Sequence, residues 1–339
     1  MARVLLTGGA GYIGTHIACV LAAAGRDSVC VDDYSNSSPR SLERVARIAP
    51  GAVQAFEVDV RDTDRLAEIL AQSDVDSVIH LAGLKAVGES VEDPARYHDV
   101  NVRGTESLLR ALAATRIRRF VFSSSCTVYG GAAPIPVDES APIAPASPYG
   151  ENKRDAERMI AGLARSDPSW RVAILRYFNP VGAHESGLIG EDPRDAPNNL
   201  MPYVCQTAIG RRPYLRIFGN DYPTPDGTGV RDYIHVMDLA EGHVAALDAL
   251  ARVSDGTVMT VNLGTGRGIS VLELVETFER VNGVAVPRRI LARRPGDIPA
   301  IYADVSRARR ELGWQTRRGL EAMCRDAWRW QSTNPEGYA

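Results

Sequence analysis

Short hydrophobic runs alternate with longer amphipathic stretches along the first half of the chain. Runs of this length, separated by helical patterns, are typical of buried parallel strands. Helical patterns occupy Asp62–Gln72, Pro94–Thr115 and Pro148–Ala164, and another leads from the first strand to Gly25. We therefore predict an α/β fold with a doubly wound parallel sheet. The predicted strands are Val4–Thr7, Ser28–Val31, Val53–Val58, Val75–Ala82, Phe120–Ser123 and Arg171–Tyr177.

The pattern changes after residue 180, where proline and glycine become more frequent. Gly182–Pro197 and Gly219–Gly229 are predicted to be long loops, and such loops are usually functional. We predict a first domain at 1–180 and a smaller α/β lobe at 181–339, with a segment near 229–265 returning to the first domain. The predicted elements of the lobe are helices at Asn198–Gly210, Met237–Ala251, Ser270–Asn282 and Ser306–Leu312 and strands at Leu215–Phe218 and Thr257–Leu263.

A glycine-rich turn follows the first predicted strand, with the sequence Gly8-Gly9-Ala10-Gly11-Tyr12-Ile13-Gly14. Gly8 would permit the tight turn, Gly11 would let the backbone approach a pyrophosphate, and Gly14 would let helix and strand pack closely. The pyrophosphate would lie against N–H groups at the helix N-terminus. This pattern predicts a Rossmann-type dinucleotide site, and the alternative is a turn with a purely structural role.

A pair of acidic residues, Asp32-Asp33, ends the next strand about twenty residues further on. A carboxylate at this point can bond the adenosine ribose and would repel a 2′-phosphate, so we predict NAD rather than NADP. Asp59, Gly83 and Ser125 also follow predicted strands. Because ligands gather at the carboxyl ends of parallel strands, we expect these residues to line one crevice.

A tyrosine and a lysine lie four residues apart in the stretch Ser147-Pro148-Tyr149-Gly150-Glu151-Asn152-Lys153. Serine as a cap and proline in the first turn predict that a helix begins here, which places Tyr149 and Lys153 on one face. A lysine cation beside a phenol favours the phenolate, so we expect a lowered pKa for Tyr149 and a role as general base and acid. Taken alone, the pair is more often an exposed helix face that has no chemistry, and the other motifs of the chain reverse this interpretation.

Composition and charge exclude several other classes of protein. The 339 residues have a net charge of −3, so no basic field indicates a nucleic-acid partner. The five cysteines are scattered and predict neither disulfides nor a metal site, and the six histidines form no H-x-x-x-H pair. No hydrophobic run reaches the roughly 18 residues of a membrane span, and the N-terminal residues lead us to expect no signal peptide. We expect a cytoplasmic protein without a membrane partner.

These motifs together resemble the extended short-chain dehydrogenase/reductase family: the glycine turn from Thr7 to Gly14, Ser125 in a triple-serine run, and Tyr149-x-x-x-Lys153. Within it, the chain resembles the UDP-glucose 4-epimerases nearly from end to end. The resemblance implies NAD-dependent interconversion of UDP-galactose and UDP-glucose in galactose metabolism. The stretches that support it are 81–90, 175–183, 198–202, 218–222 and 227–239.

The resemblance also implies roles for individual residues. Tyr149 would be the general base and acid, Lys153 its cationic partner and a ribose contact, and Ser125 a hydrogen-bond partner of the reacting sugar hydroxyl. The implied cofactor contacts are Gly8, Gly11, Tyr12, Ile13, Gly14, Asp32, Asp33, Tyr34, Ser35, Asn36, Ser37, Asp59, Val60, Leu81, Ala82, Gly83, Lys85, Ser125, Tyr149, Lys153, Tyr177 and Phe178. The implied substrate contacts are Ser125, Thr127, Tyr149, Asn179, Asn199, Leu200, Arg216, Ile217, Phe218, Arg231, Tyr233, Arg294, Asp297 and Ile301.

Three positions depart from the family pattern. Val100 stands where some members have an asparagine that contacts the cofactor, and Cys126 stands where alanine is common. Ile301 is intermediate between the tyrosine of strict glucose/galactose enzymes and the smaller residue that accompanies acceptance of N-acetylated sugars. Use of UDP-N-acetylglucosamine or UDP-N-acetylgalactosamine therefore stays open.

Three alternative functions follow from the same residues. A 4,6-dehydratase would need an acid/base pair, usually Asp-Glu, where this chain has Cys126-Thr127. An epimerase for UDP-glucuronate stays open, and a non-catalytic NAD-binding scaffold is disfavoured because Tyr149, Lys153 and Ser125 are all present. The resemblance further implies a homodimer formed through Pro94–Thr115 and Pro148–Ala164.

Overall fold

The computed structural model describes residues 3–131, 133–194, 197–294 and 296–338. A seven-stranded sheet has the order β11-β6-β5-β4-β1-β2-β3, and all its described strand pairs are parallel. The order reverses between β1 and β4, which is the topological switch point of a doubly wound sheet. This confirms the predicted fold class. The strands are β1 (Arg3–Thr7), β2 (Ser28–Asp32), β3 (Val53–Glu57), β4 (Val75–His80), β5 (Arg119–Ser125), β6 (Arg171–Tyr177) and β11 (Val258–Leu263).

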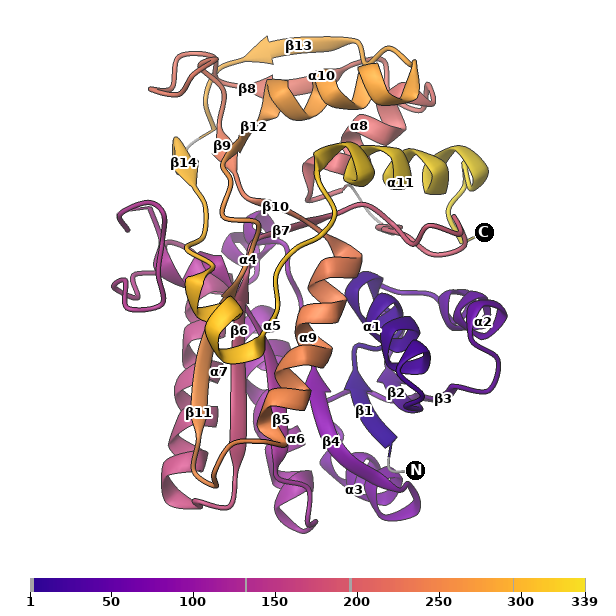
Figure 1. Cartoon of the computed structure of the whole chain (residues 1–339), viewed down its shortest axis with the longest axis vertical. Helices are drawn as coiled ribbons and strands as arrows, with labels where there is room; N and C mark the ends of the chain where they lie inside the picture. The colour runs from indigo at the N-terminus through magenta and orange to yellow at the C-terminus, as the bar shows by residue number, and fades with distance from the viewer. Residues whose placement is uncertain (1–2, 132, 195–196, 295, 339) are drawn as a thin grey trace.

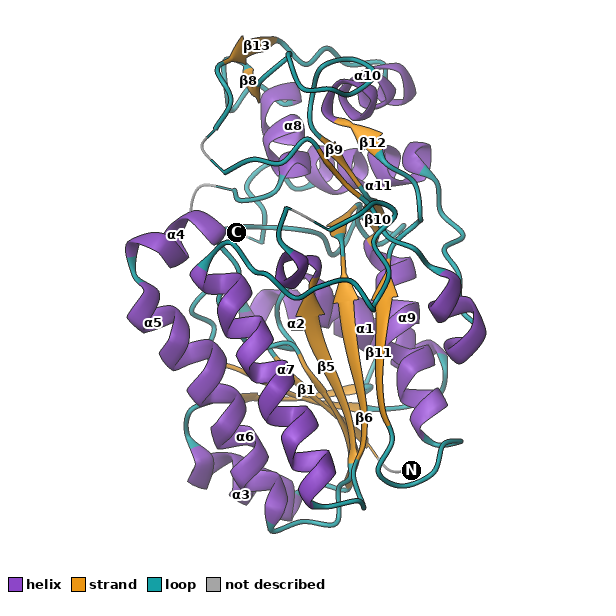
Figure 2. Cartoon of the chain, turned by 90° about the vertical axis from the view of Figure 1, so that its left-hand side faces the viewer, coloured by secondary structure: helices purple, strands orange, loops and turns teal. Residues whose placement is uncertain are grey.

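Helices cover both faces of this sheet because successive strand residues point to opposite sides (Figure 2). Val4 and Leu6 belong to the core beneath α1 and α9, whereas Leu5 belongs to the core beneath α3, α6 and α7. The helices on the first face are α1 (Tyr12–Ala23), α2 (Pro39–Ile48) and α9 (Val236–Leu250), and those on the second are α3 (Thr63–Gln72), α5 (Pro94–His98), α6 (Gly104–Ala113) and α7 (Pro148–Ser166), with the short α4 (Val87–Glu92) beside α7.

A second group of elements packs above the carboxyl ends of the strands (Figure 1). Its core is built from residues such as Val204, Leu274, Phe278 and Met323. Two long loops, which include Gly182–Gly190 and Gly219–Gly229, border it, and residues 195 and 196 of the first predicted loop lie outside the described ranges. The elements are α8 (Leu200–Ala208), β8 (Leu215–Phe218), β9 (Val230–Arg231), β12 (Ile269–Ser270), α10 (Val271–Asn282), β13 (Arg288–Leu291), β14 (Ala300–Ile301) and α11 (Leu320–Thr333).

The chain crosses between the two groups several times. Strands β7 (Asn179–Val181) and β10 (Tyr233–His235) pair in parallel at the junction, and α9 and β11 then run along the large sheet. The stretch predicted to return to the first domain thus contains all of α9 and all of β11. We retain 1–180 and 181–339 as a proposed division, with the returning segment as its exception.

Some predicted elements differ from the structure. The single helix predicted at Pro94–Thr115 consists of α5, a π-helical turn at Asp99–Arg103 and α6. The helix predicted at Ser306–Leu312 is likewise largely π-helical, at Ala308–Leu312. Helices α2 and α11 were not predicted, although Ser38-Pro39 gives α2 the same cap and first-turn signal as Ser147-Pro148.

Candidate active site

A cleft of about 770 Å³ opens at the carboxyl ends of β1, β2 and β4, beside the switch point. Its size is that of a typical small-molecule site. Residues from the glycine turn, the ends of the strands and α7 meet in it, as the sequence predicts. The predicted residues that line it are Gly8, Gly11, Tyr12, Ile13, Gly14, Asp32, Asp33, Ser35, Asn36, Ser37, Asp59, Val60, Leu81, Ala82, Gly83, Lys85, Tyr149, Lys153 and Tyr177.

The glycine turn has the close approaches that exclude larger residues. Gly8 has a φ of +68°, and a Cβ added to Gly14 would lie 2.5 Å from the Gly8 carbonyl oxygen. Gly11 is the N-cap of α1 and has no side-chain cap, so the first N–H groups of the helix face the cleft without intrahelical partners. These N–H groups can bind a pyrophosphate, so the turn fits a dinucleotide.

Asp32 lies at the end of β2 and is held by three hydrogen bonds. Its carboxylate accepts from the backbone N–H of Ala10 and Tyr34, both at 3.0 Å, and from the Ser37 hydroxyl at 2.7 Å. Tyr34 adopts a φ of +53° to make this turn. Burial raises the pKa of Asp32 above its usual range, and the three donors lower it in part. The carboxylate is therefore fixed at the edge of the cleft, where a ribose hydroxyl could reach it.

Tyr149, Lys153 and Ser125 come from two elements that meet at the cleft. The Ser147 hydroxyl accepts from the Gly150 N–H at 3.2 Å and caps α7 as predicted. Lys153 Nζ donates to the Ser123 carbonyl at 2.9 Å and lies 5.9 Å from the centre of the Tyr149 ring. Ser125 ends β5 in register with Tyr177, a residue of the cleft wall. The structure thus brings the three predicted catalytic residues together.

The expected lowering of the Tyr149 pKa is wrong for the protein alone. Burial raises this pKa to about 12, and a hydrogen bond with Ser125 offsets the rise only in part. Burial also lowers the pKa of Lys153 to about 8, although the Glu157 carboxylate acts in the opposite direction. Both shifts have the same cause, because a buried site disfavours the charged form of each side chain.

Not every predicted cofactor residue lines the cleft. Within the described ranges, Tyr34, Ser125 and Phe178 are absent from its wall. Ser125 accepts hydrogen bonds from the N–H of Thr127 at 3.2 Å and from its hydroxyl at 3.0 Å, which places these two predicted substrate contacts side by side. Phe178 is buried in a cluster with Ile301, the predicted gate of the sugar pocket.

Four predicted substrate residues gather in the smaller lobe. Asp297 pairs with Arg231 at 3.8 Å and with Arg294 at 2.8 Å. The guanidinium of Arg294 lies over the Phe218 ring, 4.8 Å from its centre. One carboxylate thus holds two guanidinium groups near an aromatic face. This combination is suited to binding the diphosphate and the nucleobase of a nucleotide.

The remaining predicted substrate residues are more dispersed. Asn179 pairs in register with Tyr233 at the junction of the two groups of elements, and Asn199 is the N-cap of α8, followed by Leu200. Arg216 is exposed on β8. The side chains of Ile217 and Tyr233 are buried in the core of the lobe, where they act as packing residues.

The cleft also contains residues that sequence reasoning missed. Tyr97 donates to Glu89 at 2.7 Å, and both line the wall, as does Glu191, which contacts Lys85. Tyr338, near the C-terminal end of the described chain, also lines the cleft. Sequence spacing gave no signal for Glu191 and Tyr338, because their positions depend on contacts between distant segments.

Comparison with known proteins identifies the same family that the sequence motifs resemble. The family model described as GDP-mannose 4,6 dehydratase matches residues 5–327. A UDP-glucose 4-epimerase of Dictyostelium discoideum is 51% identical over 99% of this chain and 98% of its own length.

Among described helices, none has the length and hydrophobicity needed to cross a membrane. No metal-binding cluster of three or more His, Cys, Asp or Glu occurs within the described ranges.

Two solved structures are similar over nearly the whole chain. A UDP-glucose-4-epimerase from Stenotrophomonas maltophila, with bound NAD and formylated UDP-arabinopyranose, has a TM-score of 0.96 and 48% identity and covers 99% of each chain. A UDP-glucose 4-epimerase from Bifidobacterium longum, in complex with NAD+ and UDP, has a TM-score of 0.95 and 47% identity over 99% of this chain and 100% of that one. The chain therefore belongs to the UDP-glucose 4-epimerase family of the extended short-chain dehydrogenases/reductases.

Proposed function

We propose that the protein is an isomerase that interconverts UDP-galactose and UDP-glucose by oxidation and re-reduction at C4, as a step of galactose metabolism. The observation that supports this most directly is that Tyr149 and Lys153 line the cleft together, with Ser125 hydrogen-bonded to Tyr149. A relative with this name matches 99% of this chain and 98% of its own length, which supports the proposal.

NAD fits the residues of the cleft. The free N–H groups at the start of α1 would hold its pyrophosphate, and Asp32 would hold the adenosine ribose. Lys153 would contact the other ribose. When bound, NAD supplies a hydride acceptor and donor and a positively charged ring.

Tyr149 would move the proton of the reaction. The phenolate takes the proton from the sugar 4-hydroxyl and later returns it, and Ser125 holds the same hydroxyl in line. Burial opposes this phenolate, since it raises the Tyr149 pKa to about 12. The charged forms of Lys153 and of the cofactor ring would therefore both be needed to bring Tyr149 into its working range.

The protein would bind the substrate through its nucleotide part and not through its sugar. Arg231 and Arg294 would clamp the diphosphate, with Asn179 and Phe218 close to the uridine, whereas the 4-keto sugar must turn over between the two half-reactions. This arrangement leaves the sugar free to present either face. The same residues disfavour a 4,6-dehydratase, because Cys126 and Thr127 cannot supply the acid/base pair for C5 and C6.

Ile301, the predicted gate of the sugar pocket, bears on which sugars are accepted. Ile301 is 7% exposed and packs with Phe178, Val128 and Ala303. A buried, branched side chain at this point neither fills the space of a tyrosine nor leaves that of a small residue. Turnover of N-acetylated UDP-sugars and of UDP-glucuronate is therefore a second candidate activity, to be measured beside the first.

We also propose a cytoplasmic homodimer. All five cysteines are free thiols, as in proteins of reducing compartments. Helices α5 and α6 follow one another end to end, α7 runs beside them on the outer face (Figure 2), and Val91 of the neighbouring α4 is 64% exposed. Sedimentation at several protein concentrations tests this proposal, and a monomer at all concentrations would contradict it.

The decisive experiment is an assay of the purified protein with UDP-galactose and no added NAD, scored for UDP-glucose. Turnover without added cofactor would support bound NAD that regains its hydride in each cycle. UDP-N-acetylgalactosamine and UDP-glucuronate are assayed in parallel as substrates. Absence of turnover with UDP-galactose, even with NAD supplied, would contradict the proposed function.

A further inference from the structure

One carboxylate oxygen bridges two residues that the sequence assigns to different ligands. Glu191 Oε1 accepts from Lys85 Nζ at 3.0 Å and from Asn199 Nδ2 at 2.7 Å. Lys85 follows β4 and lines the dinucleotide cleft, whereas Asn199 begins α8 in the smaller lobe. Glu191 therefore connects the predicted cofactor side with the predicted substrate side.

The Glu191 carboxylate is buried enough to hold Lys85 and Asn199 in fixed positions. Its side chain is 10% exposed, against 42% for Lys85, so the contact is anchored at the buried end. Exposed ion pairs contribute little because water and side-chain entropy compete with them. A shielded carboxylate with two donors holds both partners in a defined geometry.

The backbone on either side of Glu191 is fixed by aromatic residues. Trp330 Nε1 donates to the Glu191 carbonyl at 3.2 Å, and the Gly190 N–H donates to the Tyr338 hydroxyl at 3.1 Å. A Cβ added to Gly190 would lie 2.3 Å from the Trp330 ring. The chain at Gly190 thus lies directly against the indole, which sets where the carboxylate of Glu191 points.

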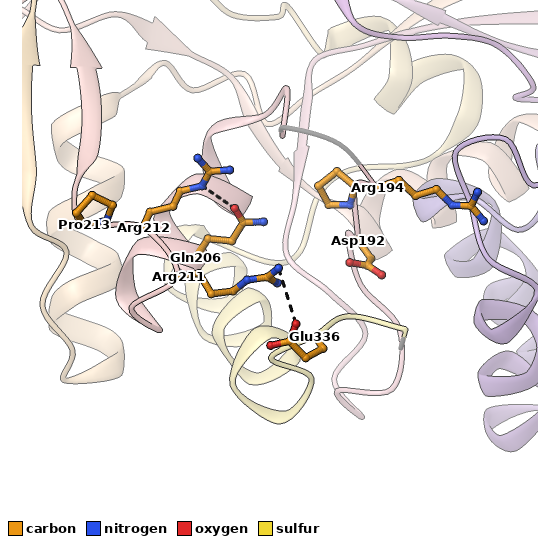
Figure 3. Close-up of a pocket in the computed structure, with 8 residues that line it drawn as sticks. Asp192, Arg194, Gln206, Arg211, Arg212, Pro213 and Glu336 are labelled. Carbon is orange, nitrogen blue, oxygen red and sulfur yellow. Dashed lines mark hydrogen bonds and ion pairs between the residues drawn. The ribbon is translucent and has the colours of Figure 1, made fainter.

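Residues 334–338 attach this segment to both groups of elements. The Tyr338 N–H donates to Asp192 at 2.9 Å, and the guanidinium of Arg44 on α2 lies over the rings of Trp330 and Tyr338, at 5.4 and 5.0 Å. Figure 3 shows Glu336 facing Arg211, which follows α8, and Asp192 nearby. The segment around Glu191 is therefore braced from α2 and from the smaller lobe.

We propose that Glu191 is a positioning residue that couples binding at the cofactor side to binding at the UDP-sugar side. An anionic ligand that takes a hydrogen bond from Lys85 leaves Glu191 to accept from Asn199 alone. Because the two donors share one oxygen, loss of Lys85 strengthens the contact with Asn199, and the second ligand meets an amide that is held more tightly. Binding of either ligand therefore favours the other, as linkage requires. This inference rests on the proposed function for its choice of ligands.

The test compares the affinity for UDP of nucleotide-free and NAD+-saturated protein by titration calorimetry. We expect NAD+ to tighten UDP binding by about tenfold, within the usual range of coupling between sites. The measured quantity is the ratio of the Kd for UDP without NAD+ to that with NAD+. In Glu191→Ala this ratio should fall to within about twofold of unity. Glu191→Gln keeps an acceptor for Asn199 but loses the charge that attracts Lys85, so it should also lose most of the ratio. Glu185→Ala, an exposed residue of the same loop, is the matched control and should keep the wild-type ratio.

Two results would overturn the inference: a wild-type ratio near unity, or a wild-type ratio retained in both Glu191 variants. A merely structural role would weaken UDP binding equally with and without NAD+, leaving the ratio intact. If Glu191→Ala does not fold, as judged by circular dichroism, Glu191→Gln decides the question. Failure of the wild type to epimerise UDP-galactose would contradict the proposed function while leaving the ratio measurable.

Discussion

Lys153 donates its hydrogen bond to the carbonyl of Ser123, 2.9 Å away, and not to the side chain of Tyr149. The backbone of β5 thus holds the ammonium while its charge faces the phenol across 5.9 Å to the ring centre. The lysine is already oriented before any ligand arrives. Its charge, however, is disfavoured by burial, which lowers the Lys153 pKa from 10.5 to about 8.

This lowered pKa predicts how stability depends on pH. The unfolded chain keeps the lysine proton up to about pH 10.4. Between pH 8 and 10 the unfolded state therefore binds more protons than the folded state, and the stability contribution of Lys153 rises with pH. In nucleotide-free protein, Lys153→Met should remove this rise, which is worth up to about 3 kcal/mol. Urea unfolding at several pH values measures it, and an equal slope in both proteins would contradict the prediction.

Tyr149→Phe should abolish the proton transfer while leaving the affinity for UDP unchanged. General acid–base catalysis contributes about 10²–10⁴-fold, so kcat for UDP-galactose should fall by about that factor. The affinity for UDP, measured by calorimetry, should stay within about twofold of wild type. Tyr214→Phe, a ring stacked on Arg289 in the smaller lobe, is the control and should keep full activity. A Tyr149→Phe enzyme with wild-type kcat would rule out the proposed base.

Removing the Arg294 guanidinium should weaken substrate binding more than turnover. Arg294 pairs with Asp297, which also contacts Arg231, at the proposed diphosphate site. Hydrogen bonds to charged groups contribute about 1.5–3 kcal/mol, so Arg294→Ala should raise the Kd for UDP about ten- to hundredfold with a small change in kcat. The neighbouring Arg293 pairs with the exposed Asp221, and Arg293→Ala should bind UDP normally. Equal effects of the two substitutions would argue against a clamp at Arg294.

The ion pair between Glu157 and Arg176 should matter for stability, because it is buried beside β5, the strand that ends in Ser125. Two hydrogen bonds of 2.7 and 3.0 Å join the side chains, and Ser124 donates to the same carboxylate at 2.5 Å. Glu157→Ala leaves a buried guanidinium without its partner and should lower the free energy of unfolding by about 3–5 kcal/mol. The exposed pair of Arg171 and Asp255 is the comparison, and Asp255→Ala should cost less than about 1 kcal/mol. Denaturant titration of both variants decides, and a Glu157→Ala loss as small as that of Asp255→Ala would refute the prediction.

Local signals in the sequence were sufficient for much of the fold and for most of the residues that line the cleft. The tight turn at Gly8 and the Ser147 cap are short-range features that depend on backbone sterics and N–H groups within a few residues. The α2 helix was missed although the same kind of signal is present at Ser38-Pro39. Strands such as β9 and β14, only two residues long, give no periodic pattern to detect.

Features that depend on three-dimensional surroundings could not be predicted in this way. Glu191 meets Lys85 across 106 positions of the chain, and no spacing rule connects them. The sequence placed Lys153 beside Tyr149 correctly but gave no measure of burial. Desolvation then raised the Tyr149 pKa, and the hydrogen bond with Ser125 lowered it only in part, which reversed the expected direction of the shift.

The seventh strand of the large sheet has a consequence for any attempt to take the protein apart. β11 pairs with β6 along its whole length, yet it is reached only after the chain has built much of the smaller lobe. A fragment that stops at residue 180 would expose β6 as a hydrophobic sheet edge, which favours aggregation. The cofactor half therefore cannot be transplanted as a module by a single cut, and a minimal stand-alone version would have to include α9 and β11 through a shortened connection.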